Sequence, residues 1–501
     1  MSSSQYAHSM QSAAGRSQTN LGPVWLTLLF LSPIALIGPN TGLALYSCFV
    51  LVLGTRLLWR PGEPPILMFI FLYQWLEAGI GPFYGNLLGV PLDTLVEFVG
   101  QNKLADFLQL TAILVLAVAI RFAAKRSIPG ISPRVQAFVA ARPLGFWLRT
   151  FVGAWIFSAV CESLAWRSGG LQQVLLVFAQ IKWAAFVLLT MATFAVPGRK
   201  KTIWTAVFLI QFALSIGGFF SNFKDVFLYS LIGLAASNVH LKKRVVLPGA
   251  LLAVVLLFLG IVWSAIKVEY RAFVNSGTGQ QVVLVNYPAR VAELGHLVSG
   301  LDAQALAAGG DRLIQRIMYF NFFGVVLDRV PNILPYEDGQ LWGDAVLRCF
   351  MPRLLFPQKS AVNDSTLTNR YTGLGVAGAQ EGTSISMGYM AEAYIDFGPI
   401  LMFVPIAMLG LFLGYFYRWL IVRPGAEAVL GAALAPFALM PAFDLGASVL
   451  KLVPWLVLSI IPCWAVLKFL GPRWFGLRRM GRAYSGIRPV RRIRPVRPAG
   501  L

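Results

Sequence analysis

The sequence predicts an all-α polytopic membrane protein with about twelve transmembrane helices and one large, partly helical periplasmic loop. Of its 501 residues, 57% are hydrophobic and only 13% are charged, and the mean hydropathy is +0.68. These values lie far outside the range of soluble globular domains. Apolar runs of about 18 to 22 residues recur along the chain, and each is long enough to cross a hydrocarbon core of roughly 30 Å as a helix.

The apolar runs divide into two groups. About nine spans are expected between residues 24 and 265, and about three more follow an amphipathic helix in the segment 386–470. The loop therefore lies between spans 9 and 10. The runs lie at 24–38, 41–58, 64–80, 104–121, 144–165, 171–196, 202–219, 223–238, 245–265, 397–417, 426–443 and 449–470.

Both ends of the chain are polar. Residues 1–23 are rich in Ser and Gln, and no Ala-x-Ala cleavage site follows the first apolar run, so we expect a disordered cytoplasmic N-terminus and no cleaved signal peptide. Residues 471–501 form a basic tail in which Ile-Arg-Pro-Val-Arg occurs at 487–491 and again at 493–497. Proline blocks helix formation there, so we expect a disordered cytoplasmic tail that lies on anionic lipid.

The net charge of +21 agrees with the positive-inside rule rather than with nucleic-acid binding. If the sides alternate and both termini are cytoplasmic, most of the basic clusters fall on the cytoplasmic side. These clusters lie near 56–60, 121–142, 199–201, 242–244 and 418–423. The sequence therefore predicts a multi-pass protein of the bacterial inner membrane, with the lipid bilayer and no nucleic acid as a partner.

The long segment 266–385 falls on the periplasmic side in this topology. Segments of this length are usually functional or disordered, and this one is too rich in apolar and aromatic residues for disorder. Helical periodicity appears at 287–301 and 311–329. We expect the segment to fold as a cap on the membrane domain.

Metal and nucleotide chemistry have no support in the sequence. The four cysteines, Cys48, Cys161, Cys349 and Cys463, are scattered and match neither a disulfide framework nor a metal site. There is no P-loop, and His296 is the single histidine of the loop. We expect no cofactor and no metal.

Basic side chains in and near the loop are candidates for phosphate binding. Arg312 and Arg316 lie one helical turn apart, which places two planar guanidinium groups on one face. The alternative is ion pairing with Asp311, Asp328, Asp344 or Asp364. The further candidates are Arg348, Arg353, Lys359 and Arg370 in the loop and Lys224 in a polar turn.

Acidic side chains lie at the predicted membrane boundary. In a helix, Tyr389, Glu392 and Asp396 share one face that enters the membrane. Carboxylates at that depth are costly unless they are paired or functional, so pairing with an arginine of the loop is the alternative. Lys182, near the middle of its span, either pairs with Glu77 or Glu162 or lines a substrate cavity.

The segment from 351 to 398 resembles Wzy-type polymerases of O-antigen or exopolysaccharide repeat units. Three stretches carry the resemblance: Met-Pro-Arg-Leu-Leu-Phe-Pro-Gln-Lys at 351–359, Gly-Thr-Ser at 382–384 and Gly-Tyr-Met-Ala-Glu-Ala-Tyr-Ile-Asp-Phe-Gly at 388–398. Outside them the similarity is one of architecture. The small outer loops depart from the arginine-rich pattern of some family members.

The resemblance implies a metal-independent glycosyltransferase that joins polyprenyl-pyrophosphate-linked oligosaccharides. Arg353, Lys359 and Arg370, with Arg312 and Arg316 in reserve, are then expected to bind pyrophosphate. Glu392 is the first choice of general base, and Glu381 or Asp396 is the second. A chain-length regulator and a flippase of the same pathway are the protein partners that the resemblance implies.

Two other classes of function are alternatives to the polymerase. An O-antigen ligase would share the span pattern and the large loop but would use a histidine there, for which only His296 is present. A lipid-linked oligosaccharide flippase or a non-enzymatic export partner forms the other class. A non-enzymatic export partner would tolerate the loss of Glu392 and Arg353.

Overall fold

The computed structural model describes residues 22–475, apart from 61–62, 126–130, 169, 216–222, 238–242, 279–282, 352–355, 357, 359–362, 379 and 381–382. Throughout these residues the regular structure is helical and no strand occurs. The predicted all-α class is therefore confirmed for this part of the chain. Glu381, Arg353 and Lys359, three of the predicted site residues, lie outside the described residues.

The helices fall into three groups along the chain. The first group is α2 (Gly22–Leu36), α3 (Thr41–Leu58), α4 (Ile66–Leu88), α5 (Leu92–Leu95), α6 (Asn102–Ala124), α7 (Ile131–Ala140), α8 (Leu144–Arg167), α9 (Gln172–Ala179), α10 (Ile181–Phe194), α11 (Thr202–Ser215), α12 (Phe223–Ala236) and α13 (Lys243–Val274). The second is α14 (Tyr287–Ser299), α15 (Ala303–Ile317), α16 (Phe320–Arg329), α17 (Gln340–Phe350) and α18 (Asp364–Thr372). The third is α19 (Tyr389–Leu401), α20 (Phe403–Ile421), α21 (Glu427–Leu439), the 3₁₀ helix η1 (Met440–Phe443), α22 (Val449–Ala465), the π-helical turn η2 (Val466–Leu470) and α23 (Gly471–Trp474).

Among the described residues, seven stretches of helix are long and apolar enough to cross a membrane. They are Thr41–Leu58, Ile66–Leu88, Asn102–Ala124, Leu144–Ala165, Gln172–Phe194, Phe403–Ile421 and Val449–Trp474. Each corresponds to a predicted span. Three shorter apolar helices, Thr27–Leu36, Thr202–Ser215 and Glu427–Phe443, correspond to three more.

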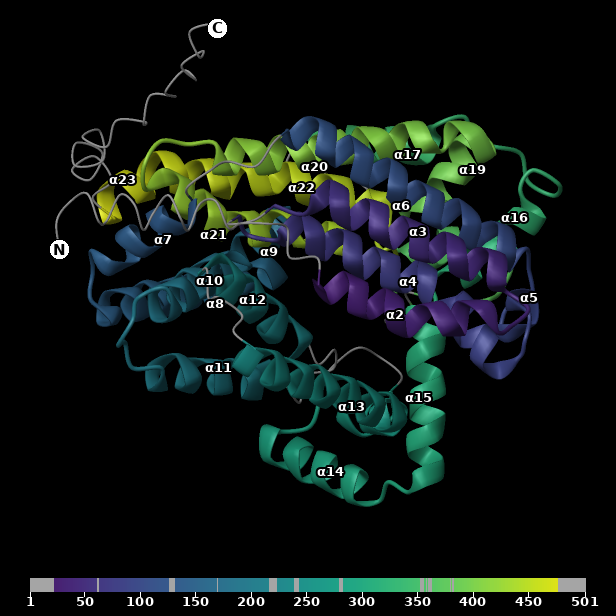
Figure 1. The fold of residues 1–501 in the computed structure, drawn as a ribbon, viewed down its shortest axis with the longest axis horizontal. Helices are drawn as coiled ribbons and strands as arrows, with labels where there is room; N and C mark the ends of the chain where they lie inside the picture. The colour runs from purple at the N-terminus through teal and green to yellow at the C-terminus, as the bar shows by residue number, and fades with distance from the viewer. Residues whose placement is uncertain are drawn as a thin grey trace, which may run out of the picture.

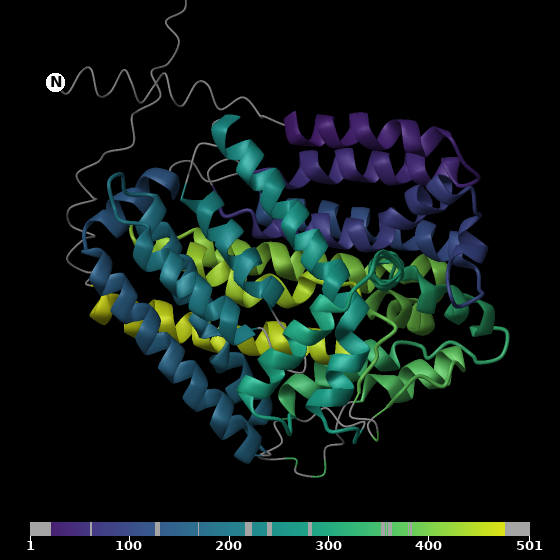
Figure 2. The ribbon, with the colours of Figure 1, turned by 90° about the horizontal axis from the view of Figure 1, so that it is seen from below.

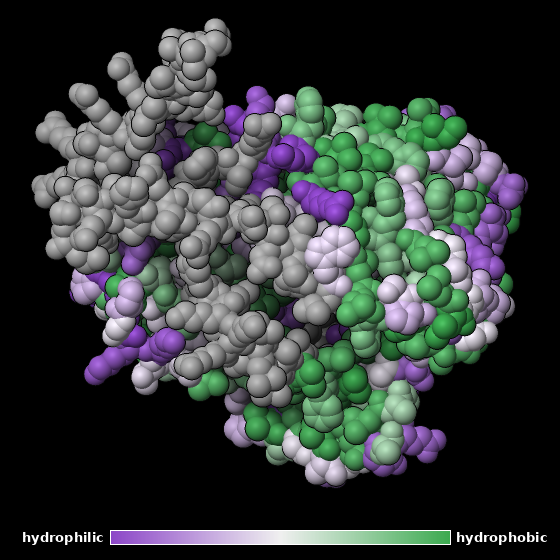
Figure 3. Space-filling model, viewed as in Figure 1, coloured by the Kyte–Doolittle hydropathy of each residue, from purple (hydrophilic) through white to green (hydrophobic). Residues whose placement is uncertain are grey.

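The long helices α3, α4, α6 and α20 pack side by side along the long axis of the molecule, and α22 runs in the same direction and packs on α21 (Figures 1 and 2). α15 stands across them and is seen end-on in Figure 2. On the described surface in Figure 3, hydrophobic side chains dominate the middle, and polar ones gather at the right-hand edge. An apolar surface around parallel helices is typical of a membrane protein.

Small residues bring α20 against α6. A Cβ added to Gly410 would lie 2.8 Å from the carbonyl oxygen of Leu116, and one added to Gly414 would lie 2.7 Å from that of Ile120. The Gly-x-x-x-Gly spacing places both glycines on one face of α20. Backbone therefore packs on backbone between these two helices.

The segment between α13 and α19 differs from the prediction in two places. α13 continues to Val274, beyond the expected end of its span at 265. The helix expected at 311–329 is broken at Met318 and Tyr319 into α15 and α16. Asp302 caps α15 by accepting a hydrogen bond from the Ala305 N–H at 2.7 Å, and α14 occupies most of the helix expected at 287–301.

Candidate functional site

A short non-helical stretch, residues 444–448, lies between η1 and α22; we call it the α21–α22 connection. Backbone groups between apolar helices need protein partners, because lipid offers none. Gln74 of α4 donates to the carbonyl oxygen of Ala442 at 2.7 Å. Glu77, one turn later, accepts a hydrogen bond from the Leu445 N–H at 2.7 Å. α4 therefore holds one side of the connection.

The other side is held by α19 and the chain before it. Glu392 accepts a hydrogen bond from the Val449 N–H at 2.6 Å, at the start of α22. Gly388 has φ +90°, and a Cβ there would collide with the carbonyl oxygen of Leu445. Only glycine combines this backbone conformation with so close an approach.

Tyr319, at the break between α15 and α16, joins these groups. Its N–H donates to the carbonyl oxygen of Glu77 at 3.1 Å, and its hydroxyl donates to that of Ser386 at 2.5 Å. Burial, followed by the negative charges of Asp444 and Glu77, raises the pKa of Tyr319 well above its usual range. The hydroxyl therefore stays protonated and acts as a donor.

Asp444 and Lys224 give the connection an accessible charged edge. Asp444 is half-buried and accepts a hydrogen bond from the Gly446 N–H at 2.8 Å. The Lys224 ammonium is exposed and lies 5.3 Å from the ring centre of Phe443 and 5.9 Å from that of Tyr73. Both Asp444 and Lys224 interact electrostatically with Glu77, which is buried.

Glu392 has the environment of a proton-transfer group but not the access. Burial raises its pKa to about 7, although the hydrogen bond from Val449 acts in the opposite direction. A pKa near neutrality suits a general base. The residue is only 1% exposed, however, and one of its carboxylate oxygens already accepts from Val449.

The predicted stripe on α19 is helical, as expected, but its members have separate partners. The Tyr389 hydroxyl donates to the side-chain oxygen of Gln74 at 3.1 Å. Asp396 accepts from the N–H groups of Leu341 and Trp342 at 3.1 and 2.8 Å, which caps the first turn of α17. Within the described residues, neither Glu392 nor Asp396 forms an ion pair with an arginine.

Four basic residues gather where α15 crosses α13; we call Lys267, Arg271, Arg312 and Arg316 the basic cluster. Burial and the charges of Arg316 and Arg271 lower the pKa of Lys267 to about 8. Burial and the charge of Arg316 lower the pKa of Arg271 to about 10. Arg312 donates to the carbonyl oxygen of Ala265 at 3.5 Å. The positive charges of the basic cluster repel one another. A bound anion would relieve this repulsion.

The basic cluster and the connection are neighbours. Arg316, Glu77 and Asp444 all interact electrostatically with Tyr73 of α4. Among the ion pairs of the described residues, none involves Lys267, Arg312 or Arg316. Arg316 of the basic cluster and the carboxylates of Glu77 and Asp444 therefore lie near the same part of α4.

The remaining predicted residues lie elsewhere. Arg370, with a side chain 57% exposed, pairs with Glu337 at 2.7 Å, and Arg348 is half-buried on α17. His296 is exposed on α14, a helix that packs against α13. Of the aspartates proposed as partners of the loop arginines, Asp364 instead pairs with Lys451, and Asp311 accepts from the Tyr84 hydroxyl at 2.7 Å.

Sequence reasoning did not select Asp444, Tyr319, Lys267 or Arg271. Asp444 could have been selected from the sequence, because it lies between two apolar runs. A carboxylate in such a position is costly and therefore suggests a function. Lys267 and Arg271 have the same one-turn spacing as Arg312 and Arg316. Tyr319 carries no such signal, since its role comes from a break inside an otherwise helical pattern.

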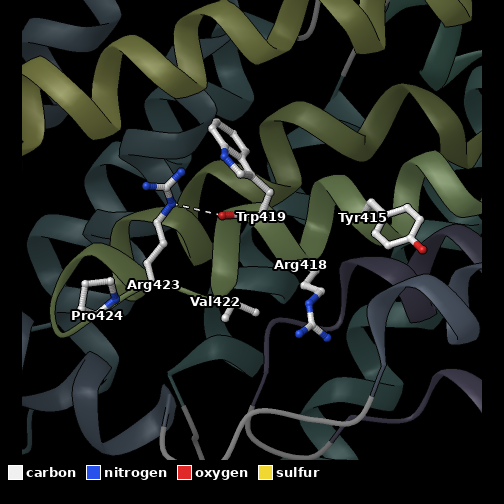
Figure 4. A pocket seen from close by; sticks show the side chains of 6 residues that line it. All are labelled: Tyr415, Arg418, Trp419, Val422, Arg423 and Pro424. Carbon is white, nitrogen blue, oxygen red and sulfur yellow. Dashed lines mark hydrogen bonds between the residues drawn. The ribbon is translucent and has the colours of Figure 1, made fainter.

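A separate hollow of about 470 Å³ lies at the C-terminal end of α20 (Figure 4). It is lined by Tyr415, Arg418, Trp419, Val422, Arg423 and Pro424. Arg423 donates to the carbonyl oxygen of Trp419 at 3.1 Å and pairs with Glu427 at 3.7 Å. The hollow shares no residue with the connection or the basic cluster.

A family model matches this chain. No curated protein and no solved structure is significantly similar to this chain. A family model described as a domain of unknown function, DUF8712, matches residues 146–440. This range contains Lys224, the basic cluster, Tyr319 and Glu392, whereas Gln74, Glu77 and Asp444 lie outside it. Because the match covers more than half of the sequence, the chain belongs to the DUF8712 family.

Proposed function

We propose that this protein is a membrane glycosyltransferase that polymerises polyprenyl-pyrophosphate-linked oligosaccharide repeat units into O-antigen or exopolysaccharide. The observation that carries the proposal is the position of the basic cluster beside the carboxylates of the α21–α22 connection. A pyrophosphate requires cations, an acceptor hydroxyl requires a base, and a polyprenyl tail requires an apolar surface. The cation Arg316 and the carboxylates of Glu77 and Asp444 lie near the same part of α4, which supports the first two requirements.

The topology that accompanies this function has twelve spans. We assign them to the seven long and three shorter apolar helices of the described residues and, as part of the proposal, to α12 and α13. Both termini are then cytoplasmic in the bacterial inner membrane, and α14 to α18 are periplasmic. In this arrangement the connection and the basic cluster open toward the periplasm, where lipid-linked repeat units and partners such as a flippase and a chain-length regulator meet.

The proposed reaction is the transfer of the growing glycan to a hydroxyl of the incoming unit. The hydroxyl oxygen attacks the anomeric carbon, the bond from that carbon to the pyrophosphate oxygen breaks, and polyprenyl pyrophosphate leaves. Lys267, Arg271, Arg312 and Arg316 stabilise the negative charge of the leaving group, so the reaction needs no metal. Lys224 neutralises negative charge near the acceptor hydroxyl.

Two carboxylates are candidates for the base that takes the hydroxyl proton. We assign this role to Asp444, because a base must reach the substrate and Asp444 is half-buried whereas Glu392 is 1% exposed. Glu392 then positions the connection through Val449. Glu392 as the base is the alternative, favoured by its pKa of about 7.

The test is glycan length in cells that lack the chromosomal copy and express single variants at equal membrane levels. Wild type should give a long ladder, and Asp444→Asn or Arg316→Ala should reduce polymer by about a hundredfold and leave single lipid-linked units. Arg167→Ala, which removes an exposed arginine of α8, is the matched control and should keep the ladder.

Each other outcome has a distinct meaning. Normal ladders in both Asp444→Asn and Arg316→Ala would refute the site. If Glu392→Gln abolishes polymerisation while Asp444→Asn does not, the base is Glu392. If wild type and empty vector give the same glycan length, the polymerase function is wrong.

A further inference from the structure

The hollow at the C-terminal end of α20 takes no part in the proposed reaction. It has a volume of about 470 Å³, and Arg418 and Arg423 are among the residues that line it. α20 itself, Phe403–Ile421, is long and apolar enough to cross a membrane. Where such a helix ends, the chain passes through the layer of lipid headgroups. The hollow therefore lies at the level of these headgroups.

One face of α20 exposes apolar side chains as far as the hollow. Met408, Tyr415 and Val422 follow one another at intervals of seven residues, so they lie on the same face of the helix. Their exposed fractions are 64%, 52% and 48%. Gly410 and Gly414, on the opposite face, pack against α6. The exposed face is thus turned away from α6, as expected of a helix surface that contacts acyl chains.

Arg418 lies at the end of this exposed face. It follows Tyr415 by three residues and precedes Val422 by four, so it is one turn from each. Its side chain is partly buried, and among the ion pairs of the described residues none involves it. A guanidinium that lacks a carboxylate partner is available to an anion, and its planar donors suit a phosphate.

Arg423 forms the other side of the hollow. Its guanidinium carbon lies 4.7 Å from the centre of the Trp419 ring, and its side chain is paired with Glu427 at 3.7 Å. Figure 4 shows the two arginines on either side of Val422, with Arg423 beside Trp419 and Arg418 extending away from them. One carboxylate for two arginines leaves a net positive charge. Trp and Tyr beside arginines are typical of a membrane–water interface.

We propose that the hollow binds the phosphate of an anionic phospholipid, with Arg418 as the phosphate ligand and Met408 and Tyr415 beneath an acyl chain. An anionic lipid is favoured because a zwitterionic headgroup would bring its ammonium group close to two guanidinium groups. The inference rests on α20 as a membrane-spanning helix and does not depend on the proposed transfer reaction.

The test compares ligands of the full-length protein, purified in a non-ionic detergent. Phosphatidylglycerol should raise the unfolding temperature by about 2 °C or more relative to phosphatidylcholine, because a ligand that binds only the folded state stabilises it. Arg418→Gln should abolish the difference between the two lipids. The matched control, Arg149→Gln, removes an exposed arginine of α8 and should retain it. An equal rise with inorganic phosphate alone would refute a lipid ligand.

A second variant keeps the test informative if Arg418→Gln does not fold. Val422→Asp places a carboxylate on the exposed face between the two arginines, and it should also abolish the effect of phosphatidylglycerol. Arg418→Lys keeps the charge and should retain most of the effect. Native mass spectrometry should show phosphatidylglycerol bound about fivefold more weakly by Arg418→Gln than by the wild type.

Two results would overturn the site. The first is an equal unfolding temperature of the wild type in phosphatidylglycerol and in phosphatidylcholine. The second is an undiminished effect of phosphatidylglycerol in Val422→Asp, or in Arg418→Gln where that variant folds.

Discussion

The Leu445 N–H donates to the carboxylate of Glu77 at 2.7 Å, across a separation of 368 residues in the sequence. Glu77 is one of the groups that hold the α21–α22 connection between two apolar helices. The same residue accepts a hydrogen bond at its carbonyl oxygen from Tyr319. One residue of α4 therefore links the connection to the break between α15 and α16.

Glu77→Ala should destabilise the protein by about 1 to 3 kcal/mol, because the buried Leu445 N–H loses its acceptor. Glu77→Gln keeps a side-chain oxygen at that position and should cost clearly less. Thermal unfolding of the purified variants measures both. Equal losses for Ala and Gln would show that the hydrogen bond to Leu445 does not stabilise the connection.

Gly388→Ala should destabilise the protein more than Gly375→Ala. Both glycines have positive φ, +90° and +66°, so alanine is strained at either position. Only at Gly388 would the added Cβ also collide with the carbonyl oxygen of Leu445, whereas nothing lies within 4 Å of it at Gly375. Unfolding temperatures that fall by the same amount in both variants would rule out a close approach at Gly388.

The stability of the wild type should fall as the pH rises from about 4.5 to about 7, compared with Glu392→Gln. Burial raises the pKa of Glu392 from 4.5 to about 7, so in this window the unfolded chain loses a proton that the folded chain keeps. Below 4.5 both states bind the proton, and above 7 the difference between the variants becomes constant. Glutamine can still accept from the Val449 N–H, so it removes the titration and keeps the hydrogen bond.

Unfolding temperatures of wild type and Glu392→Gln, measured from pH 4 to pH 8, give this difference directly. The gap should widen in favour of Glu392→Gln by the equivalent of a few kcal/mol, since one pKa unit corresponds to about 1.4 kcal/mol. Parallel curves over the whole range would mean that Glu392 does not titrate in this window.

Local patterns predicted the helices well and their tertiary contacts poorly. Apolar runs located the long helices because length and hydrophobicity alone decide whether a segment can cross a membrane. The common face of Tyr389, Glu392 and Asp396 followed from helical spacing. Their partners, Gln74, Val449 and Leu341, could not be predicted, because they come from other elements and two of the three bonds involve backbone groups.

The candidate site was predicted only in part, because local sequence patterns do not reveal contacts between different helices. Arg312 and Arg316 were identified from their spacing on α15, but their neighbours Lys267 and Arg271 depend on how α15 crosses α13. The break at Tyr319 is set by a hydrogen bond to α4, which overrides a continuous helical pattern. Arg370 is a weaker candidate for a phosphate ligand than Arg312 and Arg316, because it pairs with Glu337.

The order of the chain has a consequence for biogenesis. Gln74, Glu77, Tyr319, Gly388 and Glu392, which surround the α21–α22 connection, all precede it in the sequence. During synthesis on the ribosome they leave the translocon before their backbone partners at Ala442, Leu445 and Val449 exist. A nascent chain stopped before residue 442 contains these polar groups without their acceptors and donors, which is costly between apolar helices. Insertion of the last two helices is thus the step that completes the fold.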